Sequence, residues 1–142
     1  MSRLLKIAAV TLAFAVPSAA QAAPPDLVIL KAAVVTNVAG VPGYVRVLVR
    51  NQGMGPSLKC PLHLWVYEFK GGKVTKFLGG PFATNVPALA VGQTTWVTIA
   101  TPVTLSPQRL LRLFVDPISN MFPQGLNKES LENNNTYQLI MP

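Results

Sequence analysis

The chain has 142 residues, of which 50% are hydrophobic and 12% are charged, and its formal net charge is +7. This apolar composition excludes an intrinsically disordered chain, and the length suits one domain with its own core. The single cysteine, Cys60, excludes an intrachain disulfide, so hydrophobic packing must stabilise the fold. The basic residues form no tract, so nucleic acid is not an expected partner.

The N-terminal residues predict a secretory signal peptide. Arg3 and Lys6 precede an almost wholly apolar run from Ile7 to Val16, and Ala20-Gln21-Ala22 has the pattern of a cleavage site. The run is too short for a transmembrane helix, which needs roughly 20 residues. We therefore expect residues 1–22 to be cleaved and residues 23–142 to form one domain in the periplasm or at the cell surface. The mature net charge is then +5, from 12 − 2 = 10 basic and 5 acidic residues.

Short alternating runs separated by turn residues predict an all-β fold of about seven strands. Thirteen prolines and ten glycines punctuate the chain, and "KGGK" and "GGPF" are interpreted as turns. In "YVRVLVRN" the three valines alternate with polar or larger residues, so they are expected to face a core. The predicted strands lie at Asp26 to Thr36, 44–51, Leu62 to Phe69, Val74 to Leu78, 94–100, 110–116 and 136–141.

Several segments together resemble a known family. In chain order they are "PDLVI", "VRVLVRNQGMGPS", "LHLWVYE", "ALAVGQTTWVTI", "LFVDP" and "NKESLENNNTYQL". This series resembles the CARDB family, the cell-adhesion-related domain found in bacteria, and covers nearly all of residues 23–142. The resemblance implies an immunoglobulin-like β-sandwich in a single domain. The loop between Asp116 and Glu132 is longer than the family pattern implies. The positions that carry the pattern are Asn51, Gly53, Asp116, Pro117, Glu129, Glu132, Asn134, Asn135 and Thr136.

The run Asn133 to Asn135 before the last strand has three interpretations. Asx side chains bond to nearby backbone groups, so the run suits a tight corner, and Asp116 and Glu132 can accept backbone N–H groups there. A disordered tail is the second interpretation. The third is a calcium site, because Ca²⁺ takes oxygen ligands, although no D-x-D-x-D ladder is present. The candidate calcium ligands are Asp116, Asn120, Glu129, Glu132 and Asn133.

The usual catalytic arrangements are missing from the sequence. His63 is the only histidine, which is too few for a blue-copper site, and no G-x-S-x-G motif occurs. Cys60 and His63 are three residues apart on an extended segment, so their side chains should point to opposite faces. We therefore predict a protein that is not an enzyme and binds no cofactor.

The resemblance also implies which side of the third strand faces outward. Matching "LHLWVYE" to the family pattern places Leu62, Leu64 and Val66 in the core. Large aromatic and arginine side chains are enriched at binding hot spots, so the outward residues form a candidate binding face. Its residues are His63, Trp65, Tyr67, Leu110, Arg112 and Phe114. Two alternatives stay open: Trp65 is buried in a core of reversed register, or the loop from Pro117 to Asn135, with Met121 and Phe122, covers the face.

These features predict an exported, non-catalytic binding or adhesion module of the bacterial envelope. Its partner would be a protein or a glycan, bound at the aromatic residues or by strand addition at a sheet edge. One alternative is a periplasmic structural or assembly subunit that associates with itself. The other is a small secreted hydrolase with an unrecognised site.

Overall fold

The computed structural model describes residues 22–35, 43–117, 125–129 and 133–141, and these form seven strands. Within them, no helix is long and apolar enough to cross a membrane. The strands are β1 (Leu27–Val35), β2 (Tyr44–Asn51), β3 (Cys60–Lys70), β4 (Lys73–Val86), β5 (Thr94–Ala100), β6 (Arg109–Val115) and β7 (Thr136–Met141). The predicted signal peptide (apart from Ala22), Asn120, Met121, Phe122 and Glu132 lie outside the described residues.

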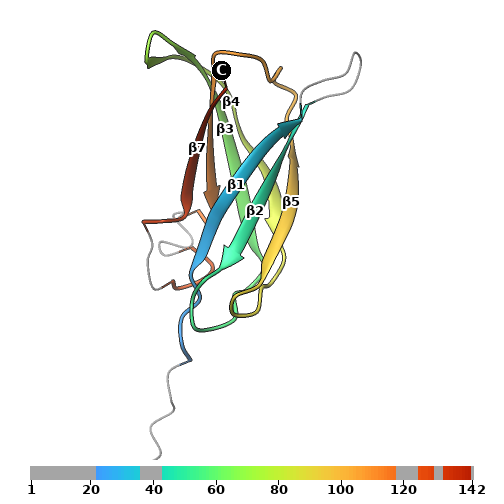
Figure 1. Cartoon of the computed structure of the whole chain (residues 1–142), viewed down its shortest axis with the longest axis vertical. Helices are drawn as coiled ribbons and strands as arrows, with labels where there is room; N and C mark the ends of the chain where they lie inside the picture. Colours follow the sequence, from blue (N-terminus) through green and yellow to red (C-terminus); the bar gives the residue numbers. More distant parts are fainter. Residues whose placement is uncertain (1–21, 36–42, 118–124, 130–132, 142) are drawn as a thin grey trace, which may run out of the picture.

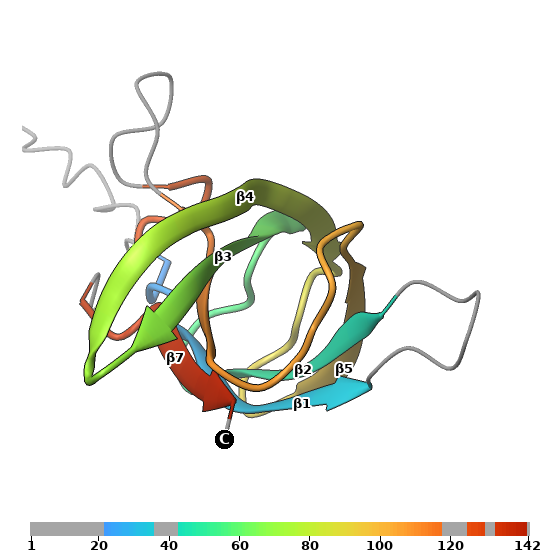
Figure 2. The same ribbon diagram turned by 90° about the horizontal axis from the view of Figure 1, so that it is seen from above.

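The strands form two antiparallel sheets packed face to face, as expected for an immunoglobulin-like β-sandwich. One sheet has the order β1-β2-β5, and the other has the order β4-β3-β6-β7. Figure 1 shows the first sheet in front of the second, and Figure 2 shows the two layers from above. At the edges of the sandwich, β7 lies near β1 and β4 lies near β5.

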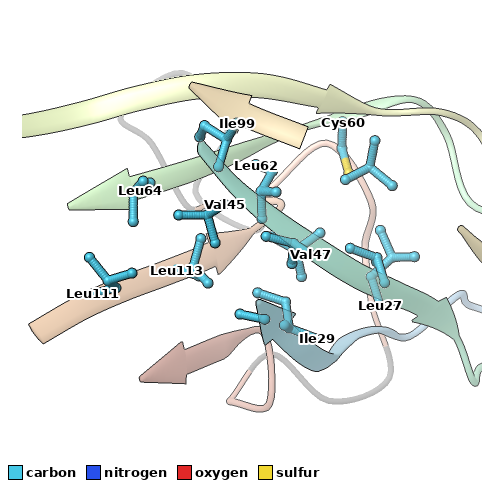
Figure 3. Close-up of a cluster of buried hydrophobic side chains, with 14 of the residues drawn as sticks. Leu27, Ile29, Val45, Val47, Cys60, Leu62, Leu64, Ile99, Leu111 and Leu113 are labelled. Carbon is cyan, nitrogen blue, oxygen red and sulfur yellow. The ribbon is translucent and has the colours of Figure 1, made fainter. Parts of the chain in front are cut away.

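The core consists of the inward residues of both sheets, which alternate with outward residues most regularly along β2 and β3. The valines of β2 and the expected inward residues of β3 are 0% exposed, which confirms the inferred register. Figure 3 shows Val45 and Val47 of β2 and Leu62 and Leu64 of β3 together with labelled side chains of β6 and β1 between the sheets. Leu89, from the β4–β5 connection, adds a further fully buried side chain. The fully buried inward residues of β2, β3 and β6 are Val45, Val47, Val49, Leu62, Leu64, Val66, Leu111, Leu113 and Val115.

The extent of β4 differs from the prediction. The "GGPF" segment, residues 79–82, is not a turn but lies inside β4, which continues to Val86. The pairing with β3 shifts in register there, from Val66↔Gly79 to Leu64↔Phe82. Gly80 has φ 130°, and a Cβ at this position would lie 2.7 Å from the Leu64 carbonyl oxygen. The glycine therefore lets β4 pass close to β3 through an irregular stretch instead of ending the strand.

Candidate functional site

The outer face of β3 and β6 collects the aromatic residues that the sequence analysis singled out. The register pairs His63 with Phe114, Trp65 with Arg112 and Tyr67 with Leu110. Because side chains directly opposite each other share a face, all six belong to the outer side of the β4-β3-β6-β7 sheet. Phe77 of β4 pairs with Tyr67 and joins this side, whereas Leu110 is buried. We call the set His63, Trp65, Tyr67, Phe77, Arg112 and Phe114 the aromatic face.

Ring contacts connect the side chains of the aromatic face. Trp65 meets Phe114 edge-to-face, with ring centroids 4.9 Å apart, and meets His63 at 5.5 Å. At the other end, Tyr67 lies 5.5 Å from Phe77, and the Arg112 guanidinium lies 5.1 Å from the Tyr67 ring centroid. Such contacts restrict the rotamers of the rings, so the face is largely formed before any partner arrives.

The side chains on this face differ in exposure. His63, Trp65 and Phe114 are partly exposed, which rules out the reversed register with Trp65 inside the core. Phe77 is 53% exposed and was not among the predicted binding residues, because its place on this face follows from the pairing of β4 with β3. The expectation that Leu110 offers contact area is wrong, since it is only 3% exposed. Leu110 lies between Tyr67 and Ile140 in the register, so its two cross-strand neighbours cover it.

A cavity of about 320 Å³ opens beside Trp65 and Phe114, at the start of the β6–β7 connection. Such a volume is at the lower end for small-ligand sites and suits one sugar ring or one large side chain. Asn135 contributes a side chain that is 6% exposed, and its Oδ1 accepts no hydrogen bond from the described part of the chain. The cavity thus combines two aromatic walls with a polar side chain whose Oδ1 is itself buried. Its lining residues are Trp65, Phe114, Val115, Asp116, Pro117, Asn135 and Thr136.

His63 should be neutral at physiological pH, because partial burial lowers the pKa of its imidazole from the usual 6.5. A pKa that is lower in the folded chain means that the unfolded chain takes up the proton first. This contribution to stability is therefore complete above pH 6.5 and decreases as the pH falls through 6.5 toward the folded pKa.

NMR titration of this single histidine measures the effect directly. We expect the imidazole resonances to titrate below pH 6.5, and we expect His63→Gln to remove the matching step in stability against pH. An imidazole that titrates at or above 6.5 would show that the ring is more solvated than the structure indicates.

The end of the sandwich where the chain enters β1 is held by a buried amide, Asn51. It is 0% exposed, and its Oδ1 accepts the N–H groups of Asp26 (3.2 Å) and Gly53 (3.1 Å). Its Nδ2 donates to the carbonyls of Gly55 (2.8 Å) and Leu89 (3.1 Å). One side chain thus joins the β2–β3 loop to the entering segment and to the β4–β5 connection.

Steric crowding explains why the N-x-G motif needs glycine at position 53. A Cβ on Gly53 would lie 2.4 Å from the backbone nitrogen of Asp26, and one on Gly55 would collide with the Ala23 carbonyl. The entering segment runs across this loop, and the Pro24 carbonyl accepts the N–H groups of Met54 and Gly55, both at 3.1 Å. Asn51 and Gly53 therefore have structural roles.

Asp116 holds the connection after β6 in place. It is 2% exposed with φ 47°, and its Oδ1 and Oδ2 accept the N–H groups of Leu126 (2.8 Å) and Asn127 (2.7 Å). Asn127 in turn accepts the Leu58 N–H through Oδ1, and Glu129 Oε1 accepts the Leu27 N–H at 3.2 Å. The connection is therefore tied to β1 and to the β2–β3 loop through side chains.

The structure describes three of the five candidate calcium ligands, Asp116, Glu129 and Asn133. Both Asp116 oxygens already accept backbone N–H groups, and Glu129 Oε1 accepts the Leu27 N–H. Among the described residues, no three His, Cys, Asp or Glu side chains gather at one point that could hold a metal ion. Asn133 is exposed. The arrangement of Asp116 is that of a loop anchor.

The remaining asparagines meet the entering segment and β6. Asn134 Nδ2 donates to Asp26 Oδ1 at 2.9 Å, and the Asn135 carbonyl accepts the Val115 N–H at 2.9 Å. The Asn135 side chain also borders the cavity beside Trp65. This part of the Asn run therefore forms the corner that leads into β7, and it contributes one wall of the candidate site.

Cys60 lies in the core, 1% exposed, whereas His63 lies on the outer face, so the two cannot act together. Burial raises the pKa of the Cys60 thiol to about 12, and the Asp116 and Glu129 carboxylates act in the same direction. The reactive thiolate is therefore scarce at neutral pH.

We expect a thiol reagent to leave the native chain unlabelled at neutral pH and to label it fully after unfolding. Met54→Cys is the matched control, because residue 54 is 82% exposed and its thiol should react at once. Rapid labelling of native wild-type chain, followed by mass spectrometry, would contradict the buried position of Cys60.

Comparisons with known proteins do not assign the chain to a family. No protein-family model matches the chain, and no curated protein matches it, so the resemblance to the CARDB family stays a prediction. A solved structure with a similar arrangement is that of DesR, a beta-glucosidase from Streptomyces venezuelae in complex with D-glucose. The identity is 17% and the TM-score 0.46, over 83% of this chain and 15% of that chain. A likeness this distant says nothing about what this chain binds or catalyses.

Proposed function

We propose that the chain is an exported, non-catalytic binding or adhesion module of the bacterial envelope that holds a protein or glycan partner against the aromatic face. The proposal rests on one observation: Trp65 and Phe114 form a preassembled, partly exposed pair beside a cavity of about 320 Å³. Aromatic side chains bury a large area at a small entropic penalty, which is why they dominate interfaces. Export to the periplasm or cell surface is part of the proposal and is supported by the N-terminal signal pattern.

The chemistry of the face favours a ligand with an apolar surface and a polar edge. The rings of Trp65 and Phe114 offer flat apolar contact, and the polar Asn135 side chain borders the same cavity. With His63 neutral, the face carries one formal charge, on Arg112. A sugar ring at the end of a glycan and a side chain on a protein loop both meet these requirements.

Binding to immobilised envelope glycans and envelope proteins tests the proposal, with the affinity of each variant measured against the best ligand. Trp65→Ala and Phe114→Ala should each weaken binding at least tenfold, or about 1.4 kcal/mol. Met54→Ala is the control, because Met54 is an apolar side chain that is 82% exposed but lies in the β2–β3 loop, outside the aromatic face. Equal losses for all three variants, or no loss for any of them, would contradict a site on the aromatic face.

A second candidate is a structural or assembly subunit, and the β7 edge favours it. This strand is the outer strand of its sheet, its sequence "TYQLIM" carries no charge, and Ile140 is 52% exposed. Uncharged edge strands pair readily with other chains. Light scattering coupled to size-exclusion chromatography separates the two candidates. A stable oligomer that dissociates in the Ile140→Lys variant favours the structural subunit, and a monomer favours the binding module.

A further inference from the structure

The outer face of the β1-β2-β5 sheet, on the opposite side of the sandwich, has a distinct pattern. The register places Lys31 across from Leu48, and Leu48 across from Trp96. The pairing of β1 shifts between Ile29 and Lys31, and such a bulge sets two residues, here Leu30 and Lys31, opposite one. One row across the sheet therefore contains Leu30, Lys31, Leu48 and Trp96.

Two arginines flank this row. Arg46 and Arg50 stand two residues to either side of Leu48 on β2, so they share its face, and both are exposed. The Arg46 guanidinium lies 5.0 Å from the centroid of the Trp96 ring. We call Leu30, Lys31, Arg46, Leu48, Arg50 and Trp96 the basic face.

No carboxylate neutralises these cations within the described part of the chain. The sequences of β1, β2 and β5 contain neither Asp nor Glu. In the described residues the single pair of a basic side chain with a carboxylate is Lys70–Glu68, on the other sheet. Lys31, Arg46 and Arg50 therefore present three positive charges to solvent within a few strand spacings of one another.

The same face exposes apolar area. Leu30 is 46% exposed and Trp96 is 43% exposed, while Leu48 between them is partly exposed. A tryptophan with a polar edge and an apolar body suits the boundary between water and hydrocarbon, where such residues are enriched. An apolar band flanked by basic side chains is the pattern of surfaces that lie on membranes.

We propose that the basic face binds an anionic lipid surface, independently of any ligand on the aromatic face. The three cations would meet lipid phosphates, and Trp96 and Leu30 would enter the headgroup boundary. Charge complementarity fits an acidic polysaccharide as well, but two observations favour lipid. Arg46 already covers one side of the Trp96 ring, which disfavours stacking of a sugar there. The exposed Leu30 would bury little apolar area against a hydrated polymer, whereas its transfer from water into a bilayer adds affinity.

The test is co-sedimentation of residues 23–142 with lipid vesicles. This segment contains all seven strands, and it lacks the apolar run of residues 7–16, which would itself enter a bilayer. We expect binding to vesicles of equimolar phosphatidylglycerol and phosphatidylcholine, no binding to phosphatidylcholine alone, and a decrease with added salt. In a Trp65→Phe background, Trp96 emission should move to shorter wavelength on binding.

A pair of charge-matched variants makes the test specific. Lys31→Gln/Arg46→Gln/Arg50→Gln should lower the partition at least tenfold, since each basic residue near an anionic bilayer contributes a factor of about five. Lys59→Gln/Lys73→Gln/Lys76→Gln removes the same charge from exposed positions elsewhere and should keep the wild-type partition. Circular dichroism checks that both variants are folded.

Three outcomes would overturn the proposal. The first is no binding to the phosphatidylglycerol vesicles. The second is an equal loss in both triple variants, which would mean that net charge alone attracts the chain. The third is binding of a soluble acidic polysaccharide through the basic face without binding of vesicles, which would assign the face to a glycan.

Discussion

Asn51→Leu is expected to destabilise the domain by about 3–5 kcal/mol, because it leaves three buried backbone groups without the partner that the structure gives them. The side chain is 0% exposed, and leucine has a similar size, so lost packing adds little. The unpaired groups would be the N–H groups of Asp26 and Gly53 and the carbonyl of Gly55, whereas the Leu89 carbonyl would still accept the Ser57 N–H. Urea unfolding followed by circular dichroism measures the change.

The neighbouring Gln52 provides the control for this prediction. Gln52 is exposed and makes one side-chain hydrogen bond, to Asp26 Oδ2 at 3.0 Å, so Gln52→Ala should change stability by less than about 1 kcal/mol. Equal effects of the two substitutions would mean that Asn51 does not organise this end of the sandwich.

Asp116→Ala is expected to destabilise the domain by about 3 kcal/mol, since it removes two hydrogen bonds to a buried charged group. The backbone adds to the effect, because φ at this residue is 47°, a region that Asp and Asn tolerate better than Ala. Asp116→Asn keeps that tolerance and one acceptor oxygen, so we expect a smaller loss of about 1–2 kcal/mol.

Amide hydrogen exchange locates the effect of Asp116. The amides of Leu126 and Asn127 donate to the Asp116 carboxylate, so their protection should disappear in the alanine variant and decrease in the asparagine variant. Asn133→Ala is the matched control at an exposed position nearby. Unchanged protection in Asp116→Ala would show that other contacts hold the connection.

The strands could be predicted because their inward and outward residues alternate. In β2 and β3 the alternation of apolar residues is nearly strict, and the structure places the expected side chains in the core. The "GGPF" segment was misread, because Gly and Pro usually mark turns. Only the pairing of β4 with β3 shows that Gly80 serves a close strand crossing.

The candidate site was less predictable, since it depends on which strands are neighbours. Trp65 and Phe114 are far apart in sequence, and their contact follows from the β3–β6 register. The burial of Leu110 and the exposure of Phe77 depend on cross-strand neighbours, which periodicity along one strand does not reveal. The cavity and the place of Asn135 beside it depend on how the β6–β7 connection is anchored.

The most direct test of the proposed binding site is the emission of Trp65 as the only tryptophan. In a Trp96→Phe chain, purified envelope polysaccharides and then envelope proteins are titrated while the Trp65 emission is recorded. We predict a saturable shift with one class of ligand, abolished by Phe114→Ala. Saturable binding by an independent assay with no change in Trp65 emission would contradict the aromatic face as the binding site.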